Sequence, residues 1–297
     1  MAIEVLAPAK INLTLEVLGR RPDGYHEILS VMQTVSVYDR VRIEHASGLE
    51  IDLSGPEAAG VPKESRLNLA YLAAEALLQA YGHASHGARI AVEKTIPTGM
   101  GLGGGSSDAA AVLRGLNVLW GLGLPTEALG RIAARLGSDV AFFLCGGAAL
   151  ASGRGEVVEP LPDAAPRAIT LFLGGETIEE KTRRMYGLLS MADYSDGRAT
   201  LGVAESIRRG RPVAEADLLN VFDRHVAAVA PTVGQVMDLC RDSGVAVHAA
   251  GGGMAFFACA GVDELPAHLV DGLARVGHTA RACKIVPRQE SLEVREV

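Results

Sequence analysis

Cysteine is scarce in this chain, and its spacing excludes two kinds of framework. The four cysteines, Cys145, Cys240, Cys259 and Cys283, are far apart and include no CxxC pair. At this density in 297 residues, neither a disulfide scaffold nor a zinc site of the usual spacing is expected. The sequence therefore predicts free thiols in a reducing cytosol.

Long hydrophobic runs are also missing. The longest, VAFFLCGGAALA and GGGMAFFACAGV, are rich in glycine and shorter than the ~20 residues that a membrane-spanning helix requires. The opening segment MAIEVLAPAKINLTL lacks the basic stretch and unbroken apolar run of a signal peptide. We expect a soluble cytoplasmic protein without a membrane partner.

Positive charge and aromatic residues are both limited. Lysine and arginine number 28 against 35 acidic residues, for a net charge of −7, and aromatic residues make up 4%. No basic stripe is interleaved with aromatics, so a nucleic-acid partner is not expected. No HExxH motif or acidic cluster with metal-ligand spacing is present, so no metal held by the protein alone is predicted.

What the sequence does contain is a mixture of strand and helix patterns. Residues 3–17 and 30–45 alternate apolar and polar positions, as half-buried strands do, and 48–55, 87–97, 168–175 and 279–286 predict further strands. Helices are predicted over 65–82, capped by Ser65, and over 125–137, 231–244 and 264–277. A further helix is predicted directly after the glycine cluster, where an apolar stripe is formed by Val112, Leu113, Leu116, Leu119 and Trp120. The class is α+β.

A domain boundary is predicted at the segment LPDAAPR, residues 161–167, which is rich in proline and alanine and has no periodicity. It divides the chain into 1–160 and 161–297. No internal repeat is evident.

The most unusual stretch is IPTGMGLGGGSSDAA, residues 96–110, with five glycines in seven residues before a helical pattern. Ordering glycine costs more backbone entropy than ordering any other residue, so a close approach to a ligand is a better explanation than a plain turn. A Walker loop would need lysine after its last glycine, but Ser106 follows. The spacing G-x-G-x-x-G also occurs here, although too late in the chain for a dinucleotide-binding unit.

A third interpretation is a loop that binds an anion at a helix N-terminus. Successive glycines let N–H groups converge, and the helix adds unpaired donors and partial positive charge. Ser106 or Ser107 would either cap the helix or offer a hydroxyl to phosphate or Mg²⁺.

These residues carry a family resemblance. PTGMGLGGGSSDAA resembles the phosphate loop of the GHMP small-molecule kinases, and APAKINLTL (7–15) and HAAGGGMAFFAC (248–259) resemble two further motifs of that family in the same order. The last has Ala250 and Gly252 where hydroxyl residues are common. GRRPDGYHEILSVMQTV and GSDVAFF are similar to the branch that acts on a cytidine diphosphate sugar alcohol in non-mevalonate isoprenoid synthesis.

The resemblance implies a two-lobed GHMP kinase fold with the active site in the cleft between the lobes. It implies phosphorylation of the substrate's 2-hydroxyl group by ATP, with Mg²⁺ carried by the nucleotide. The alternatives are another GHMP kinase, of homoserine or mevalonate type, and a non-catalytic nucleotide-binding regulator. No oligomeric state is predicted.

The resemblance also implies roles for single residues. Asp139 is expected to accept the proton of the attacking hydroxyl and Lys10 to keep that carboxylate ionised. ATP is expected to contact Pro97, Thr98, Gly99, Met100, Gly101, Leu102, Gly103, Gly104, Gly105, Ser106, Ser107, Asn68 and Lys94. The substrate is expected to contact Asn12, Tyr25, His26, Thr182 and Tyr186, with aromatic rings stacking on cytosine.

Several of these residues have an ordinary structural explanation as well. An acid such as Asp139 is often a helix cap or a buried hydrogen-bonded group, and Lys10 and Lys94 fit solvent-facing strand positions. Asn68 and Thr182 fit helix positions, Asn12 a strand edge, and Tyr25 with His26 an exposed hairpin tip.

Overall fold

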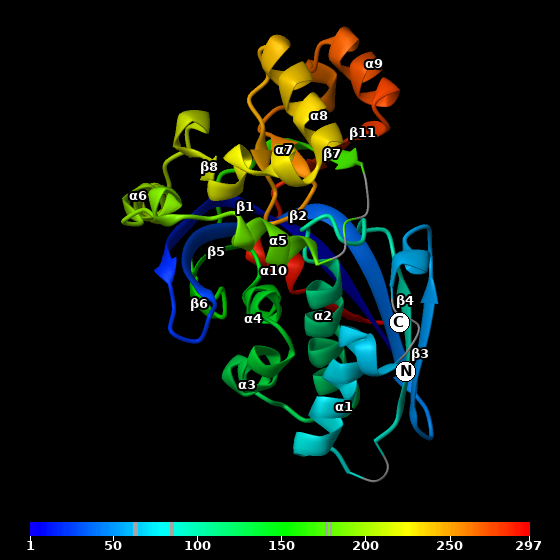
Figure 1. The fold of residues 1–297 in the computed structure, drawn as a ribbon. Coiled ribbons are helices and arrows are strands. Elements are labelled where there is room, and N and C mark those ends of the chain that lie inside the picture. Colours follow the sequence, from blue (N-terminus) through cyan, green and yellow to red (C-terminus); the bar gives the residue numbers. More distant parts are fainter. Residues whose placement is uncertain (62–64, 84–85, 176–177, 179) are drawn as a thin grey trace.

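The computed structural model describes residues 1–297 apart from 62–64, 84–85, 176–177 and 179. Two long strands dominate it, β1 (Ala2–Arg20) and β2 (His26–His45), joined by a short turn at residues 21–25. Their apolar residues are buried, as the alternation predicted, and β1 is covered on both faces over most of its length. Figure 1 shows these strands crossing the middle of the molecule.

The first sheet is built around this pair. β1 and β2 are antiparallel, with Lys10 opposite Thr34 and Asn12 opposite Met32. β4 (Ala88–Glu93) pairs with residues 40–45 of β2, and β3 (Leu49–Ser54) pairs with β4. β5 (Ala148–Gly153) pairs with residues 28–33 of β2, and β6 (Val157–Pro160) pairs with β5. The short β8 (Leu219–Asn220) pairs with β1 in parallel.

Four helices cover one face of this sheet (Figure 1): α1 (Leu69–Tyr81), α2 (Gly104–Leu119), α3 (Thr126–Leu136) and α4 (Ser138–Cys145). Helix α2 is buried along most of its length and packs on β1 and β2. The expected cap of the first helix was wrong, because Asn68 rather than Ser65 caps α1 and residues 65–67 form a 3₁₀ turn. Helix α4 was not predicted, because an unbroken apolar run has no helical periodicity.

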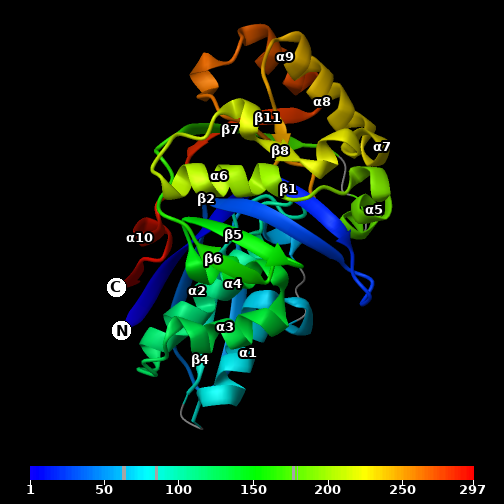
Figure 2. The same ribbon diagram turned by 90° about the vertical axis from the view of Figure 1, so that its left-hand side faces the viewer.

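The second sheet has the order β11-β7-β10-β9. Its strands are β7 (Ala168–Gly174), β9 (His248–Ala249), β10 (Phe256–Ala258) and β11 (His278–Lys284). Helices α7 (Val226–Val229), α8 (Pro231–Asp242) and α9 (Ala267–Arg275) lie beyond it, and α5 (Lys181–Gly187) lies between it and the first unit (Figure 1). Helix α6 (Arg198–Arg208) packs on β1 and β2 (Figure 2).

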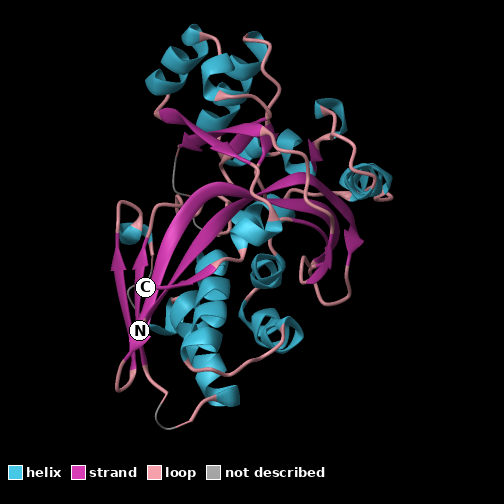
Figure 3. Cartoon of the chain, turned by 180° about the vertical axis from the view of Figure 1, so that it is seen from behind, coloured by secondary structure: helices cyan, strands magenta, loops and turns pink. Residues whose placement is uncertain are grey.

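The chain finally returns to the first sheet. After α10 (Arg288–Ser291), strand β12 (Val294–Glu296) pairs antiparallel with β1, with Ile3 opposite Glu296. Figure 3 shows the two ends of the chain next to each other. The predicted boundary at 160/161 lies between β6 and β7, and we propose it as the division of the two units, with the returning segment built into the first.

No helix within the described ranges is both long and apolar enough to cross a bilayer.

Candidate phosphate-binding and catalytic site

The glycine cluster forms a tight loop that leads into α2. Gly99, Gly101 and Gly103 have φ values of 75°, 83° and 76°, in the left-handed region that favours glycine. At Gly103 a Cβ would also lie 2.7 Å from the Phe143 ring. These positions explain why the chain uses glycine here.

The loop presents unused donors at the N-terminus of α2. The cap is Gly103, which makes no side-chain bond, so the predicted capping by Ser106 or Ser107 was wrong. The first-turn amides of Gly104, Gly105 and Ser106 have no protein acceptor in the part of the chain that the structure describes. Within the same part, the buried Ser107 hydroxyl has no hydrogen-bond partner. Free amides at a helix N-terminus attract anions.

The third glycine motif packs directly against this loop. A Cβ on Gly253 would lie 2.1 Å from the Met100 carbonyl oxygen, and one on Gly101 would lie 2.7 Å from the Gly253 Cα. Ala255 N–H donates to the same Met100 carbonyl at 3.1 Å. Residues 251–253 and the loop therefore touch backbone to backbone, although some 150 residues separate them in the sequence.

Lys10 and Asp139 face each other beside the loop, as predicted. The Lys10 Nζ lies 4.0 Å from Asp139 Oδ2, and the lysine side chain is 6% exposed against 36% for the carboxylate. Burial lowers the pKa of Lys10, and the charge of Asp139 opposes that shift. The backbone N–H of Lys10 donates to the Leu102 carbonyl at 3.0 Å, which anchors this part of β1 to the loop.

Asn12 positions Lys10. Its Oδ1 accepts from Lys10 Nζ at 2.6 Å, and its Nδ2 donates to Ser30 Oγ at 2.6 Å. The Ser30 hydroxyl in turn donates to the Thr14 carbonyl at 2.5 Å. The predicted substrate contact of Asn12 stays a prediction; what the geometry gives is a buried chain of bonds that fixes the ammonium group. Sequence reasoning missed Ser30, although it lies within the quoted segment GRRPDGYHEILSVMQTV.

Lys94 lies behind the loop in a buried ion-pair network. Its ammonium group contacts Asp39 and Asp108, and its side chain is 2% exposed. Asp39 also accepts the N–H of Ile96 at 2.8 Å and that of Thr95. Burial lowers the pKa of Lys94, but the two carboxylates outweigh that effect and raise it. The network supports the loop from below, and a nucleotide contact by Lys94 stays a prediction.

Asn68 caps α1, which lies beside α2. Its Oδ1 accepts from Ala70 N–H at 2.9 Å and from Tyr71 N–H at 3.3 Å. The sequence analysis had named a position in a helix as the alternative role of Asn68, and this cap agrees with it. The expected contact with adenine or ribose stays a prediction. Pro97 and Thr98 lie at the outer end of the loop, where Thr98 is exposed and makes only long bonds, at 3.5 Å, to Glu57.

The aromatic residues expected to bind cytosine lie together at the other end of the site. The His26 ring stacks on Tyr186 with centroids 5.1 Å apart, and Tyr194 approaches His26 edge-on at 6.2 Å. That separation leaves no room for a base between His26 and Tyr186 as they stand here, and the substrate contacts of Tyr25, His26 and Tyr186 stay predictions. A base would have to stack outside the pair or separate it. Tyr25 is exposed, with the Arg154 guanidinium 4.9 Å from its ring centroid.

Helix α5 contributes Tyr186, Thr182 and a residue that sequence reasoning missed. Burial and the charge of Asp139 raise the pKa of the Tyr186 hydroxyl, so it stays protonated. The exposed Thr182 lies beside Gly252, its Cγ2 4.0 Å from where a Cβ on that glycine would be. Lys181 donates to the Gly99 carbonyl of the loop. No motif indicated Lys181, because its partner is 82 positions away.

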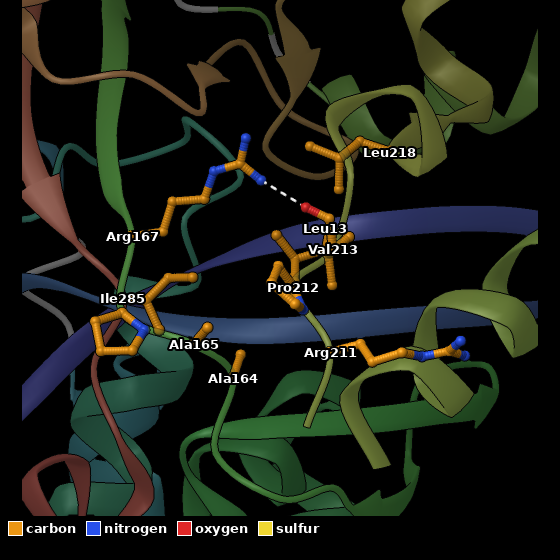
Figure 4. A pocket seen from close by; sticks show the side chains of 10 residues that line it. Leu13, Ala164, Ala165, Arg167, Arg211, Pro212, Val213, Leu218 and Ile285 are labelled. Carbon is orange, nitrogen blue, oxygen red and sulfur yellow. Dashed lines mark hydrogen bonds between the residues drawn. The ribbon is translucent and has the colours of Figure 1, made fainter. Parts of the chain in front are cut away.

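A separate small pocket does not belong to this site. It measures about 250 Å³ and is lined mostly by apolar residues, among them Leu13, Pro212 and Ile285 (Figure 4). Arg167 donates across it to the Val213 carbonyl at 2.9 Å. None of the predicted site residues lines it.

The described residues contain no group of three or more His, Cys, Asp or Glu side chains arranged to hold a metal ion. The groups that suit Mg²⁺ carried by a nucleotide are oxygen donors near the loop. Ser107 Oγ and Asp108 Oδ1 are buried and, among the described residues, unpartnered. Hard cations prefer such oxygen ligands together with substrate phosphates, so the donor set fits.

The segment that contains the phosphate loop matches a known protein family. Residues 68–147 match the family model described as GHMP kinases N terminal domain. A solved homoserine kinase from Cytophaga hutchinsonii, 17% identical, has a TM-score of 0.73 and covers 99% of this chain and 97% of its own, so the two share a fold. The fold is therefore that of the GHMP kinases, α+β as predicted, and this class consists of ATP-dependent small-molecule kinases.

Three relatives are more specific. A protein from Bacillus cytotoxicus named 4-diphosphocytidyl-2-C-methyl-D-erythritol kinase is 37% identical over 99% of this chain and all of its own length. A protein of that name from Brevibacillus brevis is 43% identical over 82% of each chain. A crystal structure of 4-(cytidine 5'-diphospho)-2C-methyl-D-erythritol kinase is 35% identical, with a TM-score of 0.75 over 95% of this chain and 98% of its own. The chain belongs to the 4-diphosphocytidyl-2-C-methyl-D-erythritol kinase family.

Proposed function

We propose that this protein transfers the terminal phosphate of ATP to the 2-hydroxyl group of 4-(cytidine 5'-diphospho)-2-C-methyl-D-erythritol. The observation that carries the proposal is the Lys10–Asp139 pair, 4.0 Å apart beside a loop of free amides. A carboxylate close to a loop of free amides supports the proposal, because phosphoryl transfer to an alcohol needs a proton acceptor near the bound phosphate.

The chemistry follows from these groups. The free amides at the start of α2 would hold the phosphate oxygens. Mg²⁺ brought by the nucleotide would be held by oxygen donors such as Ser107, and it would supply neutralisation of the phosphate charge. Asp139 takes the proton of the substrate's 2-hydroxyl group. The hydroxyl oxygen forms a bond to the terminal phosphorus of ATP, and the bond from that phosphorus to ADP breaks. The Lys10 ammonium, held in place by Asn12, stabilises the negative charge that develops between it and the phosphate.

The cytidine end of the substrate would lie near His26, Tyr25 and Tyr186. Stacking on an aromatic face contributes ~1–3 kcal/mol per base. A nucleic-acid partner is not part of the proposal, since the net charge is −7. The four cysteines are free thiols, which suits the predicted cytoplasmic location.

A coupled ADP-release assay tests the proposal. The acceptors are the cytidine diphosphate substrate, its uridine analogue, homoserine and mevalonate. We expect turnover with the cytidine compound, at least tenfold less with the uridine analogue and none with the other two. Turnover with homoserine or mevalonate would assign another GHMP kinase activity, and ATP binding without any turnover would make the protein a regulator.

A further inference from the structure

Lys181 is a buried ammonium group that no step above uses. It is the first residue of α5, its exposed fraction is 9%, and its Nζ donates to the Gly99 carbonyl of the phosphate loop. Of the residues described in α5, it reaches the loop directly, while Thr182 lies beside Gly252 and Tyr186 stacks on His26. It therefore connects the second unit to the place where the phosphates would lie.

The charges around Lys181 do not balance. Lys10 is close enough for its charge to act on Lys181. These two lysines form a cluster with one carboxylate, that of Asp139, which lies 4.0 Å from Lys10. Among the described residues, no carboxylate forms an ion pair with Lys181, whereas the ammonium of Lys94 has two. Two ammonium groups and one carboxylate leave an excess positive charge. A charge removed from water is costly unless it is paired, so this cluster favours an anion.

We infer that Lys181 is a second phosphate-binding cation, which exchanges the Gly99 carbonyl for an oxygen of the terminal phosphate of bound ATP. The inference rests on the proposed function, because it assumes that the loop holds ATP. The terminal phosphate is the chosen partner because Lys181 shares its neighbourhood with Lys10, the residue placed beside the acceptor proton. Helix α5 would then close on the nucleotide and bring Tyr186 and Thr182 with it.

A consequence of this contact is proton uptake. Burial, followed by the charge of Lys10, lowers the pKa of Lys181 to about 8. The groups that face this cluster are Lys10 from β1, Asp139 from α4 and Tyr186 from α5 itself. A phosphate beside the ammonium would raise its pKa, since an opposite charge favours the charged form. Near pH 8 the protein should therefore bind a fraction of a proton together with ATP.

The experiment is titration calorimetry of ATP and ADP binding at pH 8, in buffers of different ionisation enthalpy. The proteins are the parent, Lys181→Met, Lys181→Arg and the control Arg183→Met, whose side chain is exposed on the same helix. We expect Lys181→Met to bind ATP about 10- to 100-fold more weakly, the range of a charge-assisted hydrogen bond, with little change for ADP. It should also lose the proton uptake of the parent. Lys181→Arg should bind ATP within a few-fold of the parent, and Arg183→Met should behave as the parent.

Several results would overturn the inference. Equal weakening of ATP and ADP would place Lys181 elsewhere on the nucleotide. An effect confined to the KM of the cytidine substrate would assign it to that substrate's diphosphate. Unchanged ATP affinity in Lys181→Met would contradict it, and if that variant failed to fold, Lys181→Gln would take its place. If the parent bound neither nucleotide, the proposed function itself would fail.

Discussion

Two buried lysines lie against the phosphate loop, Lys94 next to Gly104 and Lys10 next to Gly103, and their surroundings differ. Lys94, at the base of the loop, is held by two carboxylates, and one of these, Asp39, also binds the backbone of the loop's approach. Lys10, on the open side, has a neutral amide at 2.6 Å and a single, partly exposed carboxylate at 4.0 Å. The first is electrostatically satisfied within the protein, while the second keeps capacity for a ligand.

This difference separates structural from functional charge. A buried ammonium group that is paired with two carboxylates holds segments in place, and its charge is not available to a ligand. An ammonium group that is incompletely paired can stabilise charge that develops during a reaction. The comparison predicts that changes at the Lys10 side affect turnover and that changes at the Lys94 side affect stability.

Loss of the carboxylate beside Lys10 should have the largest effect. Asp139→Asn keeps the side-chain size but removes the proton acceptor, and general-base catalysis is typically worth about 10²- to 10⁴-fold. We expect a fall in kcat of that order, measured by ADP release, with unchanged ATP affinity. Asp242→Asn, at the end of α8, serves as the control and should match the parent. A kcat for Asp139→Asn within tenfold of the parent would remove Asp139 from the mechanism.

Loss of the Lys94 ammonium group should act on stability. Lys94→Met leaves Asp39 and Asp108 facing each other in a buried site, and breaking such a network typically costs about 3–5 kcal/mol. We expect a lower free energy of unfolding, measured in urea. ATP affinity should fall only to the extent that the phosphate loop becomes less ordered. A variant as stable as the parent that has lost ATP binding would instead place Lys94 on the nucleotide, as the sequence had suggested.

The smallest expected effect concerns the glycine contact that supports the phosphate loop. Gly253→Ala inserts a methyl group 2.1 Å from the Met100 carbonyl, so the loop must move, at a cost of ~1–3 kcal/mol. ATP affinity and the thermal midpoint should both fall. Gly202→Ala, in α6 with nothing within 4 Å, is the matched control and should stabilise by about 0.5–1 kcal/mol. Equal behaviour of the two variants would mean that the contact is not rigid.

Much of the fold could be predicted because its signals are local. Alternation revealed β1 and β2, and the apolar stripe after the glycine cluster revealed α2. Helix α4 could not be read, because its apolar residues form a continuous run that suits a buried strand equally well. The cap of α1 was misplaced by three residues, because both Ser65 and Asn68 are suitable caps.

The site divides in the same way. The loop glycines and the Lys10–Asp139 pair followed from motifs that the sequence displays. The partners of Lys94 and the role of Lys181 depend on contacts between residues far apart in the chain, which no spacing encodes. The stacking of His26 on Tyr186 is of this kind too, since 160 positions separate them.

The strand that completes the edge of the first sheet is made from residues 294–296, although its partner, β1, is made from residues 2–20. During synthesis this part of β1 therefore has no β12 to pair with until the ribosome has made the roughly 290 residues that separate the two paired segments. An open strand edge invites pairing with another chain, so the delay exposes the nascent protein to mispairing that the finished molecule avoids.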